Sequence, residues 1–462
     1  MKFEPFFIEN LEILDLISDG RGLARHDNRI IMVKNAIPGD VANVWIYKKQ
    51  KNYLEAEISQ LITPSKDRIL PPCKHFGTCG GCKLQSVLYD TQLKFKQKQV
   101  EDAITRIGKL QVKEILPIQG SEKIYFYRNK LEFSFSTFAW KSNKNSPDEY
   151  NALGFHVPQF WDKVLDIHEC LLQNPLINNI RNAVKEFAIT HHLSFYNPRE
   201  QKGFLRNLLF RTTEYKNQLM VGVILGENHP SNEKKIIEFL LEKFPEITTL
   251  VTILNTKKND SYSDLTWETH KGEGYIYEQI EDKLFRISPL TFFQTNSLQA
   301  LKLYQTIKSW ISKPVNLIYD LYSGCGSIGI FVSDLAQKII GIEYVPSAVT
   351  DAVYNLNMNQ INHLQYFAGD MSKLLTHEFI KENGKPEVII TDPPRAGMDE
   401  KVVKKLLEIE SPMILYVSCN PSTQARDLQI LSEKYELERV QAFDMFPHAH
   451  HVENLAMLKL KF

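Results

Sequence analysis

Residues 315–326 read VNLIYDLYSGCG, an apolar segment that runs directly into a glycine-rich turn. Four further apolar segments follow along the chain, each separated from the next by a stretch with helical spacing: KIIGIEY (338–344), LQYFAGD (364–370), EVIITDPP (387–394) and MILYVSC (413–419). Strands that alternate with helices predict a parallel, doubly wound sheet. We therefore expect an α/β, Rossmann-like domain over residues 286–462, whose functional loops lie at the carboxyl ends of its strands.

The segments before this domain have a different pattern. In residues 1–62, short apolar segments alternate with turns such as Pro38-Gly39-Asp40, which predicts a small β-barrel. Residues 63–285 mix strands and helices and predict a central α+β domain, with a surface loop at 142–151. An amphipathic helix is expected over 89–110, where it can pack on the C-terminal domain. Its apolar stripe contains Tyr89, Leu93, Val100, Ile104 and Ile107, while Lys94, Lys96 and Lys98 lie largely outside the stripe.

Composition limits the class of protein. The 462 residues are 43% hydrophobic and 24% charged, as in ordinary globular proteins, and no apolar run approaches the roughly 18 residues of a membrane helix. The N-terminus carries acidic residues where a secretory signal has an apolar core, so we expect a cytoplasmic protein without membrane contact. Formal net charge is zero, but residues 61–130 hold 13 Lys or Arg against 6 Asp or Glu. This surplus is either an RNA-binding patch or a solvated helix face.

The turn after the first strand suggests a nucleoside site. It is followed by a helix, a second strand and Glu343, which lies 23 residues after Asp320 and can accept hydrogen bonds from both ribose hydroxyls of an adenosine. The loop lacks the complete GxGxxG pattern and the GxxxxGK[ST] pattern. S-adenosylmethionine therefore fits better than a nicotinamide dinucleotide. Asp370 is placed to contact adenine and Tyr322 to line the methionine side, unless each is only a polar group bound to local backbone.

Two other strand ends carry candidate catalytic groups. Asp392 lies in TDPPRAG (391–397), and Cys419 lies in VSCNPST (417–423), where it ends a core strand and precedes Asn-Pro. The thiol is either a nucleophile or a structural cysteine. The segment FPHAHHVE (446–453) offers Glu453 as a general base, with His450 and His451 behind it. A thiol, a base and hydrogen-bond donors would suit methylation of uracil carbon 5, because thiolate addition at carbon 6 makes carbon 5 nucleophilic.

The motifs FFQTN, DLYSGCG, DPPRAG, VSCNPST and HHVEN, in this order, resemble the RNA uracil-5 methyltransferase family, which includes bacterial 23S ribosomal RNA and tRNA enzymes. The N-terminal segment with DGRG and PGD resembles the TRAM domain, an RNA-binding barrel. The resemblance runs through nearly the whole chain and implies a class I methyltransferase that uses S-adenosylmethionine. It makes Cys419 the nucleophile and Glu453 the proton-abstracting base. It assigns the following residues to the cofactor or the immediate active site, with Asp370 placed beside them: Gln294, Tyr322, Glu343 and Asp392. Many relatives have Phe in place of Tyr322, and residues 127–130 (YRNK) resemble a family segment that supports the fold or contacts RNA.

Four cysteines form a possible metal site: Cys73, Cys79, Cys82 and Cys170. Four thiolates suit either a tetrahedral zinc ion or a [4Fe–4S] cluster, and the spacing alone does not choose between them. The family resemblance implies the [4Fe–4S] cluster, in a structural or RNA-orienting role. The cluster and the TRAM-like segment favour 23S ribosomal RNA, and hence a role in rRNA processing, over tRNA.

Three alternatives remain from the sequence: a tRNA uridine-5 methyltransferase, a non-catalytic RNA-binding protein, and a cytosine-5 methyltransferase. The intact DPPR, SCNP and HVE set argues against a non-catalytic protein. A cytosine enzyme is expected to carry its cysteine in a Pro-Cys setting. We expect a monomer.

Overall fold

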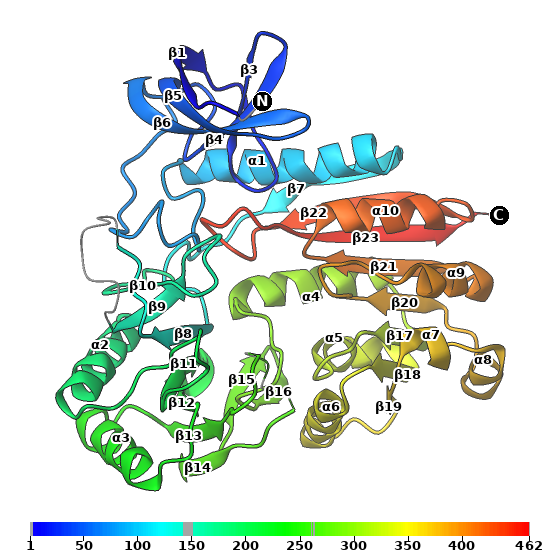
Figure 1. Cartoon of the computed structure of the whole chain (residues 1–462). Helices are drawn as coiled ribbons and strands as arrows, with labels where there is room; N and C mark the ends of the chain where they lie inside the picture. Colours follow the sequence, from blue (N-terminus) through cyan, green and yellow to red (C-terminus); the bar gives the residue numbers. More distant parts are fainter. Residues whose placement is uncertain (1–2, 142–150, 260, 262–263, 462) are drawn as a thin grey trace.

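The structure is a computed structural model that describes residues 3–141, 151–259, 261 and 264–461. The loop predicted at 142–151 lies almost entirely outside these residues. Three large sheets follow one another along the described chain, and a two-stranded hairpin joins the second sheet to the third (Figure 1). None of the described helices is both long and apolar enough to cross a membrane.

The N-terminal sheet confirms the predicted β-rich module. Its six strands pair in the order β1-β5-β6-β4-β3-β2. Along β5, alternate side chains are buried, so that Ala42, Val44 and Ile46 form the core while their neighbours face outward. The strands are β1 (Phe6–Glu12), β2 (Asp15–Leu16), β3 (Gly22–His26), β4 (Arg29–Lys34), β5 (Val41–Lys49) and β6 (Tyr53–Thr63).

The predicted helix is present as α1 (Tyr89–Asp102) and continues as a π-helical turn to Ile107. Val100 and Ile104 pack into the core of the C-terminal domain, but Ile107 is 47% exposed and does not belong to the stripe. The expected position of Lys96 was wrong, because its side chain is 1% exposed. Lys96 is four residues before Val100 and therefore shares the buried face. Its amine is paired with Asp444 at 2.5 Å.

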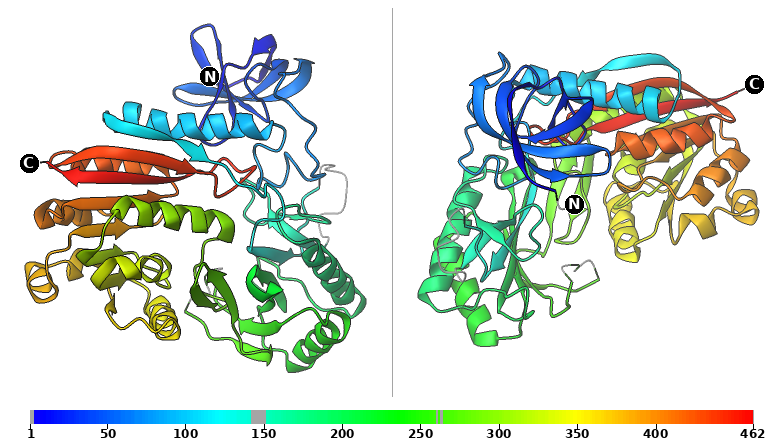
Figure 2. Two further views of the ribbon diagram at one scale, coloured as in Figure 1. Left: turned by 180° about the vertical axis from the view of Figure 1, so that it is seen from behind. Right: turned by 45° about the horizontal axis from the view of Figure 1, so that its top comes forward.

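The strand after α1 belongs to the C-terminal sheet. Residues of β7 (Val112–Gln119) pair in parallel with β22, although the sequence-based division places them in the central segment. Figures 1 and 2 show α1 and β7 beside β22 and β23, close to the end of the chain. A segment from the first quarter of the chain thus completes the sheet formed by the last third.

The central sheet has seven strands in the order β10-β9-β8-β11-β12-β13-β14. Two helices, α2 (Pro175–Thr190) and α3 (Pro230–Lys243), pack on the same face through a core that includes Phe133 and Phe210 (Figure 1). Its strands are β8 (Lys130–Ser136), β9 (Ala152–His156), β10 (Val164–Asp166), β11 (Leu205–Thr212), β12 (Leu219–Leu225), β13 (Thr249–Leu254) and β14 (Glu268–Lys271). The hairpin of β15 (Ile276–Ile280) and β16 (Lys283–Ile287) leads out of this domain.

The C-terminal sheet confirms the predicted α/β domain. Its order is β19-β18-β17-β20-β21-β23-β22-β7, and the five strands predicted from the sequence are all parallel to one another. These five strands are β17 (Val315–Leu321), β18 (Ala336–Glu343), β19 (Leu364–Ala368), β20 (Val388–Thr391) and β21 (Met413–Ser418). β22 (Tyr435–Phe443) runs parallel to β7, whereas β23 (Glu453–Leu460) is antiparallel to both of its neighbours.

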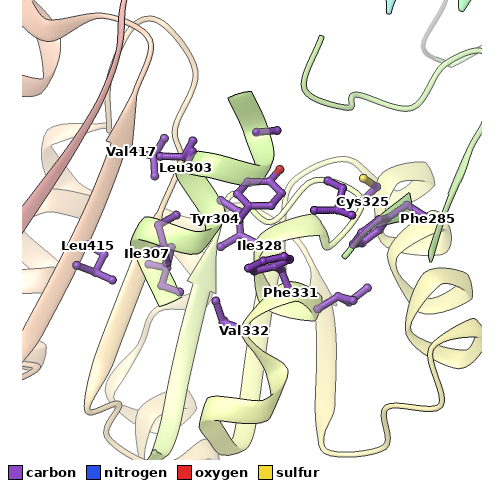
Figure 3. Packing of buried hydrophobic residues seen from close by; sticks show 14 of the residues in the cluster. Phe285, Leu303, Tyr304, Ile307, Cys325, Ile328, Phe331, Val332, Leu415 and Val417 are labelled. Atoms are coloured by element: carbon purple, nitrogen blue, oxygen red, sulfur yellow. The ribbon is translucent and has the colours of Figure 1, made fainter. Parts of the chain in front are cut away.

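Helices cover both faces of this sheet, and each face has its own apolar core. The helices are α4 (Ser297–Ile311), α5 (Ser327–Phe331), α6 (Pro346–Met358), α7 (Met371–Leu374), α8 (His377–Asn383), α9 (Glu400–Ile409) and α10 (Pro421–Leu431). Cys325 lies in one of the cores, 2% exposed, beside Phe285 and Phe331 (Figure 3). Cys325 is therefore a structural cysteine.

Candidate active site

The loop after β17 has open space above it. Tyr322 and Gly324 both have a positive φ, of 60° and 55°, which turns the chain sharply at the end of the strand. A Cβ atom added to Gly324 would meet no atom within 4 Å. The hydroxyl of Ser323 is buried and has no hydrogen-bond partner in the described residues. An open surface and an unpaired buried hydroxyl fit a polar ligand on this loop.

Glu343 lies beside this loop, as the sequence predicted. One carboxylate oxygen accepts from the Gly324 amide at 2.9 Å, and the other accepts from the Val345 amide at 2.8 Å. The two backbone donors fix the carboxylate, and each oxygen keeps a lone pair for a further donor. The geometry suits a ribose, which offers two adjacent hydroxyls.

Two more carboxylates lie at neighbouring strand ends. Asp370 follows β19 and accepts from the Ser372 amide at 2.8 Å as the N-cap of α7, so part of its hydrogen bonding is local. Asp320 was not singled out in the sequence as a site residue. It is 1% exposed, and burial raises the pKa of its carboxyl to about 7, despite a hydrogen bond from the Gly329 amide. Asp320 fixes the position of the loop, because its carboxylate accepts a hydrogen bond from the Gly329 amide in the first turn of α5.

Cys419 meets the other candidate catalytic groups at the end of β21. Its thiol is half-buried, and burial raises the pKa of Cys419 to about 11. The nearby carboxyls of Glu453 and Asp392 also raise this pKa, whereas Arg395 lowers it through its charge and a hydrogen bond to the thiol. The structure thus brings the predicted nucleophile and the predicted base together. Gln294 joins them, because its amide nitrogen lies 3.4 Å from Oδ2 of Asp392.

The two carboxyls beside Cys419 hold protons unusually tightly. Their removal from solvent raises the pKa of Asp392 to about 7 and places the pKa of Glu453 well above its ordinary value. The Asp392 charge raises the pKa of Glu453 further, while Arg395 acts in the opposite direction. Without ligand, Asp392 is therefore about half protonated near pH 7, and Glu453 keeps its proton to a higher pH than an ordinary carboxyl. A cationic ligand would favour release of these protons.

Arg395 and the histidine pair form the outer wall of the crevice. Nη2 of Arg395 lies 2.7 Å from Nδ1 of His451. Burial is the main cause that lowers the pKa of His451 to about 3 and that of His450 to about 4. Both rings are therefore neutral at physiological pH. Because the guanidinium stays charged and only donates, the His451 ring acts as its acceptor. The DPPR motif pointed to this arginine, but no sequence signal linked it to His451.

The four candidate metal ligands line one cavity of about 680 Å³. The same cavity is lined by Gln294, Arg395 and the histidine pair, so it opens onto the crevice of Cys419. Burial raises the pKa of Cys79 to about 11 and that of Cys82 to about 12, and the charges of the neighbouring cysteines raise both further. Buried thiols that disfavour one another's ionisation fit a site that a metal would stabilise.

The spacing of the thiols gives a second test of fit. A zinc ion with four bonds of about 2.3 Å would hold its sulfur ligands about 3.8 Å apart. In the part of the chain that the structure describes, the one set of three His, Cys, Asp or Glu ligand atoms within 4.8 Å of one another is Glu233, Glu268 and His270. That set lies near β14, at the opposite edge of the central sheet from β10 and Cys170. Within the described residues, no three of the four cysteine sulfurs therefore lie within 4.8 Å of one another.

Ion pairs reduce the basic surplus of residues 61–130. Six of its thirteen basic side chains lie within 4 Å of a carboxylate: Arg68, Lys96, Lys98, Arg106, Lys113 and Lys123. Lys96 is also fully buried. The part of this segment that can attract phosphate is thus smaller than its composition suggests.

Comparison with known proteins supports both ends of the chain. Residues 8–59 match the TRAM domain, and residues 266–461 match the family described as tRNA (Uracil-5-)-methyltransferase. An RNA methyltransferase of Bacteroides thetaiotaomicron is 47% identical over 455 residues, which cover 96% of this chain and 100% of that relative. An RNA methyltransferase of Porphyromonas gingivalis is 42% identical over 461 residues, which cover 97% and 99%.

A solved structure extends the similarity to the whole fold. The tRNA (uracil-54, C5)-methyltransferase of Pyrococcus abyssi, in complex with S-adenosyl-L-homocysteine, has a TM-score of 0.74 and 28% identity. The match covers 97% of this chain and 99% of that one. With a TRAM domain, a methyltransferase fold and full-length relatives above 40% identity, this chain belongs to the RNA uracil-5 methyltransferase family of S-adenosylmethionine-dependent enzymes.

Proposed function

We propose that this chain transfers the sulfonium methyl group of S-adenosylmethionine to carbon 5 of a specific uridine in RNA, with Cys419 as nucleophile and Glu453 as base. The observation that carries this proposal is the meeting of a thiol, a buried carboxyl and a guanidinium in one crevice. A uracil ring placed between Cys419 and Glu453 would present carbon 6 to the thiol and carbon 5 to the carboxyl.

The groups in this crevice can be assigned to successive steps. The Cys419 thiolate, stabilised by Arg395, adds to carbon 6 and pushes the electron pair of the C5–C6 double bond into an enolate. Carbon 5 then bonds to the methyl carbon, which leaves its sulfur. Glu453 next takes the proton from carbon 5, the double bond re-forms, and the thiolate leaves carbon 6. Gln294 and Asp392, which lie 3.4 Å apart in the same crevice, are placed to orient the uracil ring during these steps.

The remaining predicted residues suit the adenosine and methionine parts of the cofactor. Glu343 would accept from the ribose hydroxyls, Asp370 would contact adenine, and Tyr322 would line the methionine side. S-adenosylmethionine supplies the methyl group and a positive charge beside the carboxyls. The Pyrococcus abyssi structure, which contains S-adenosyl-L-homocysteine, supports the choice of cofactor.

The test of the mechanism is a pair of variants. Glu453→Gln should trap RNA as a covalent adduct on Cys419, which would be visible on a denaturing gel. Glu436→Gln is the matched control, because this glutamate is an exposed side chain of β22 that pairs with Lys113. Cys419→Ala should abolish turnover and leave the affinity for S-adenosylmethionine within about twofold. Loss of a binding interaction worth about 1.4 kcal/mol would instead lower that affinity tenfold. Residual methylation by Cys419→Ala would remove this cysteine from the mechanism.

We propose 23S ribosomal RNA as the substrate, on the basis of the cysteine site and the TRAM domain. The second candidate is tRNA, because the Pyrococcus abyssi neighbour acts on uracil 54 of tRNA. Mapping 5-methyluridine in ribosomal and transfer RNA from a deletion strain distinguishes the two. Loss of the modification from tRNA alone would overturn the ribosomal assignment.

We further propose that Cys73, Cys79, Cys82 and Cys170 hold a [4Fe–4S] cluster in a structural or RNA-orienting role. The four thiols around one cavity, no three of them within 4.8 Å of one another in the described residues, support this choice. Protein purified without oxygen should be brown and contain about four irons per chain, as the cluster stoichiometry requires. A colourless and fully active protein with one zinc ion would overturn it.

A further inference from the structure

The segment between β22 and β23, residues 444–452, leads directly into Glu453 and is held by several distant parts of the chain. Four of its carbonyls accept side-chain hydrogen bonds: Asp444 from Gln299 at 3.0 Å, Met445 from Asn296 at 3.3 Å, Phe446 from Lys96 at 2.9 Å and Pro447 from Tyr127 at 3.1 Å. Its first side chain, Asp444, is fully buried and also accepts from Tyr89 at 2.8 Å. The position of the proposed base therefore depends on residues outside the C-terminal domain.

His448 makes the contacts that connect this segment to the cysteine-rich segment. Its carbonyl accepts from the backbone amides of both Lys83 and Leu84, at 2.8 and 2.9 Å. Lys83 and Leu84 directly follow Cys82, one of the four candidate metal ligands. The side-chain amide nitrogen of Gln85 also donates to the Cys82 sulfur at 3.2 Å. Lys83 and Leu84 lie within two residues of Cys82, so movement of the loop around Cys82 would displace the His448 carbonyl that they hold.

The His448 side chain fixes the same turn from the other side. The backbone amide of His448 donates to Oε1 of Gln92 at 3.1 Å, and its ring nitrogen Nδ1 lies 3.2 Å from Nε2 of Gln92. The ring is 1% exposed and stacks on Tyr125, with centroids 4.4 Å apart. His448 has a φ of 67°, which is uncommon for a residue with a side chain and persists only where the surroundings determine it. These contacts impose the backbone conformation that turns the chain toward Glu453.

We propose that His448 is a positioning residue that fastens the Glu453 segment to the cysteine-rich segment, so that metal occupancy of the four cysteines controls the proton-abstraction step. The inference rests on the proposed function of Glu453 and of the cysteines. When the metal is lost, Lys83 and Leu84 lose their fixed position and release the His448 carbonyl. Thiolate addition and methyl transfer persist, since Cys419 directly follows β21 and not the His448 segment, but removal of the carbon 5 proton slows.

The consequence for the reaction is specific. Until Glu453 takes the carbon 5 proton, the electron pair of that C–H bond cannot re-form the C5–C6 double bond, and the Cys419–C6 bond does not break. A displaced Glu453 therefore makes the methylated covalent adduct accumulate. A misplacement of about 1 Å can slow a catalysed step about a hundredfold.

The first experiment uses two variants of one residue. His448→Gly permits the positive φ but removes the ring contacts to Gln92 and Tyr125. We expect kcat to fall about 10- to 100-fold, KM for S-adenosylmethionine to stay within about twofold, and the adduct to accumulate at steady state. Asn also tolerates positive φ and keeps an amide for Gln92, so His448→Asn should recover most of kcat. Equal damage in both variants, or a rise in KM without adduct, would overturn the proposal.

The second experiment reads metal retention without activity. Coupling between two sites is reciprocal for binding, so His448→Gly should lose metal to a chelator at a concentration at least about threefold lower than the parent. Tyr89→Phe is the control, because it removes a bond to the other end of the segment, at Asp444. It should leave the chelator concentration unchanged. Unchanged metal retention in His448→Gly would overturn the coupling.

Failure of the inference and failure of the proposed function give different results. An adduct in Glu453→Gln but not in His448→Gly refutes the positioning role and leaves the base assignment intact. An adduct in neither variant refutes the base assignment itself. Parent protein freed of metal by chelation should form the adduct as His448→Gly does, and an adduct-free, inactive protein would show that the metal acts elsewhere.

Discussion

The charge of the cofactor should activate the proposed nucleophile, and this can be measured on Cys419 directly. With a pKa of about 11, only about one Cys419 thiol in a thousand is ionised at pH 8 in the ligand-free protein. Alkylation by iodoacetamide requires the thiolate, so the ligand-free rate should be low. S-adenosylmethionine brings a sulfonium cation into a crevice that already contains Asp392 and Glu453.

The size of the effect follows from electrostatics. A unit charge about 6 Å from the sulfur, at an effective dielectric constant of about 20, stabilises the thiolate by about 3 kcal/mol. This corresponds to about two pKa units. The thiolate fraction at pH 8, and with it the alkylation rate, should rise about a hundredfold when S-adenosylmethionine binds. Proton release from Asp392 and Glu453 after the cation binds would oppose this gain, because their negative charges raise the pKa of Cys419.

The assay is mass spectrometry of the Cys419 peptide after timed exposure to iodoacetamide. S-adenosylhomocysteine is the matched control, since it has nearly the same shape and no sulfonium charge. It should change the rate by less than about threefold, because it supplies no Coulomb term. Arg395→Gln should slow alkylation in all three states, since the arginine lowers the pKa of this thiol. Equal rates with both ligands would refute the electrostatic reasoning, and a slower rate with S-adenosylmethionine would show that it shields the thiol.

Three further predictions concern stability and RNA binding. Burial raises the pKa of Asp320 to about 7, so the folded state keeps a proton that the unfolded state releases near pH 4. The contribution of this proton to the free energy of unfolding is complete below about pH 4 and is lost as the pH rises through 7. Asp320→Asn should therefore gain about 3 kcal/mol relative to the parent between pH 5 and 8 in urea titrations, and a pH-independent difference would contradict this. Lys96→Met should lower the free energy of unfolding by about 3 to 5 kcal/mol, because it leaves Asp444 buried without its cation, and Lys96→Met with Asp444→Leu should recover part of this loss. RNA affinity should fall with salt concentration, with a log–log slope of about −2 to −5 in filter-binding titrations. The slope is modest because no more than seven basic side chains of residues 61–130 lie outside carboxylate pairs. A flat response would exclude this surface from RNA binding.

The sequence predicted the parts of the fold that depend on local pattern. Each of the five parallel strands lies where an apolar segment ends in a polar turn, and Glu343 reaches the loop predicted for it. The distant partners had no local signal. Lys96 is a polar residue on a buried face, and only the position of Asp444, almost 350 residues later, explains it. The pairing of β7 with β22 and the contact between Arg395 and His451 are equally non-local.

The site was predictable to a similar extent. The cysteine that ends β21 and the one that follows β17 look alike in the sequence, since both occur in small, polar turns. Packing distinguishes them, because Cys325 points into an apolar core whereas Cys419 faces carboxyls and an arginine. Likewise, His448 had no role in the sequence analysis, because its contacts come from Lys83, Leu84 and Gln92.

The position of β7 has a consequence for how the protein is made. The edge strand of the C-terminal sheet is β7, and its partner β22 is synthesised more than 300 residues later. During translation, residues 112–119 must therefore wait, without their partner, until nearly the whole chain has left the ribosome. A C-terminal fragment produced alone would present the bare edge of β22 and the apolar surface that Val100 and Ile104 normally cover. Such a fragment should aggregate, and shortening this protein to its methyltransferase domain would require α1 and β7 to be retained or replaced.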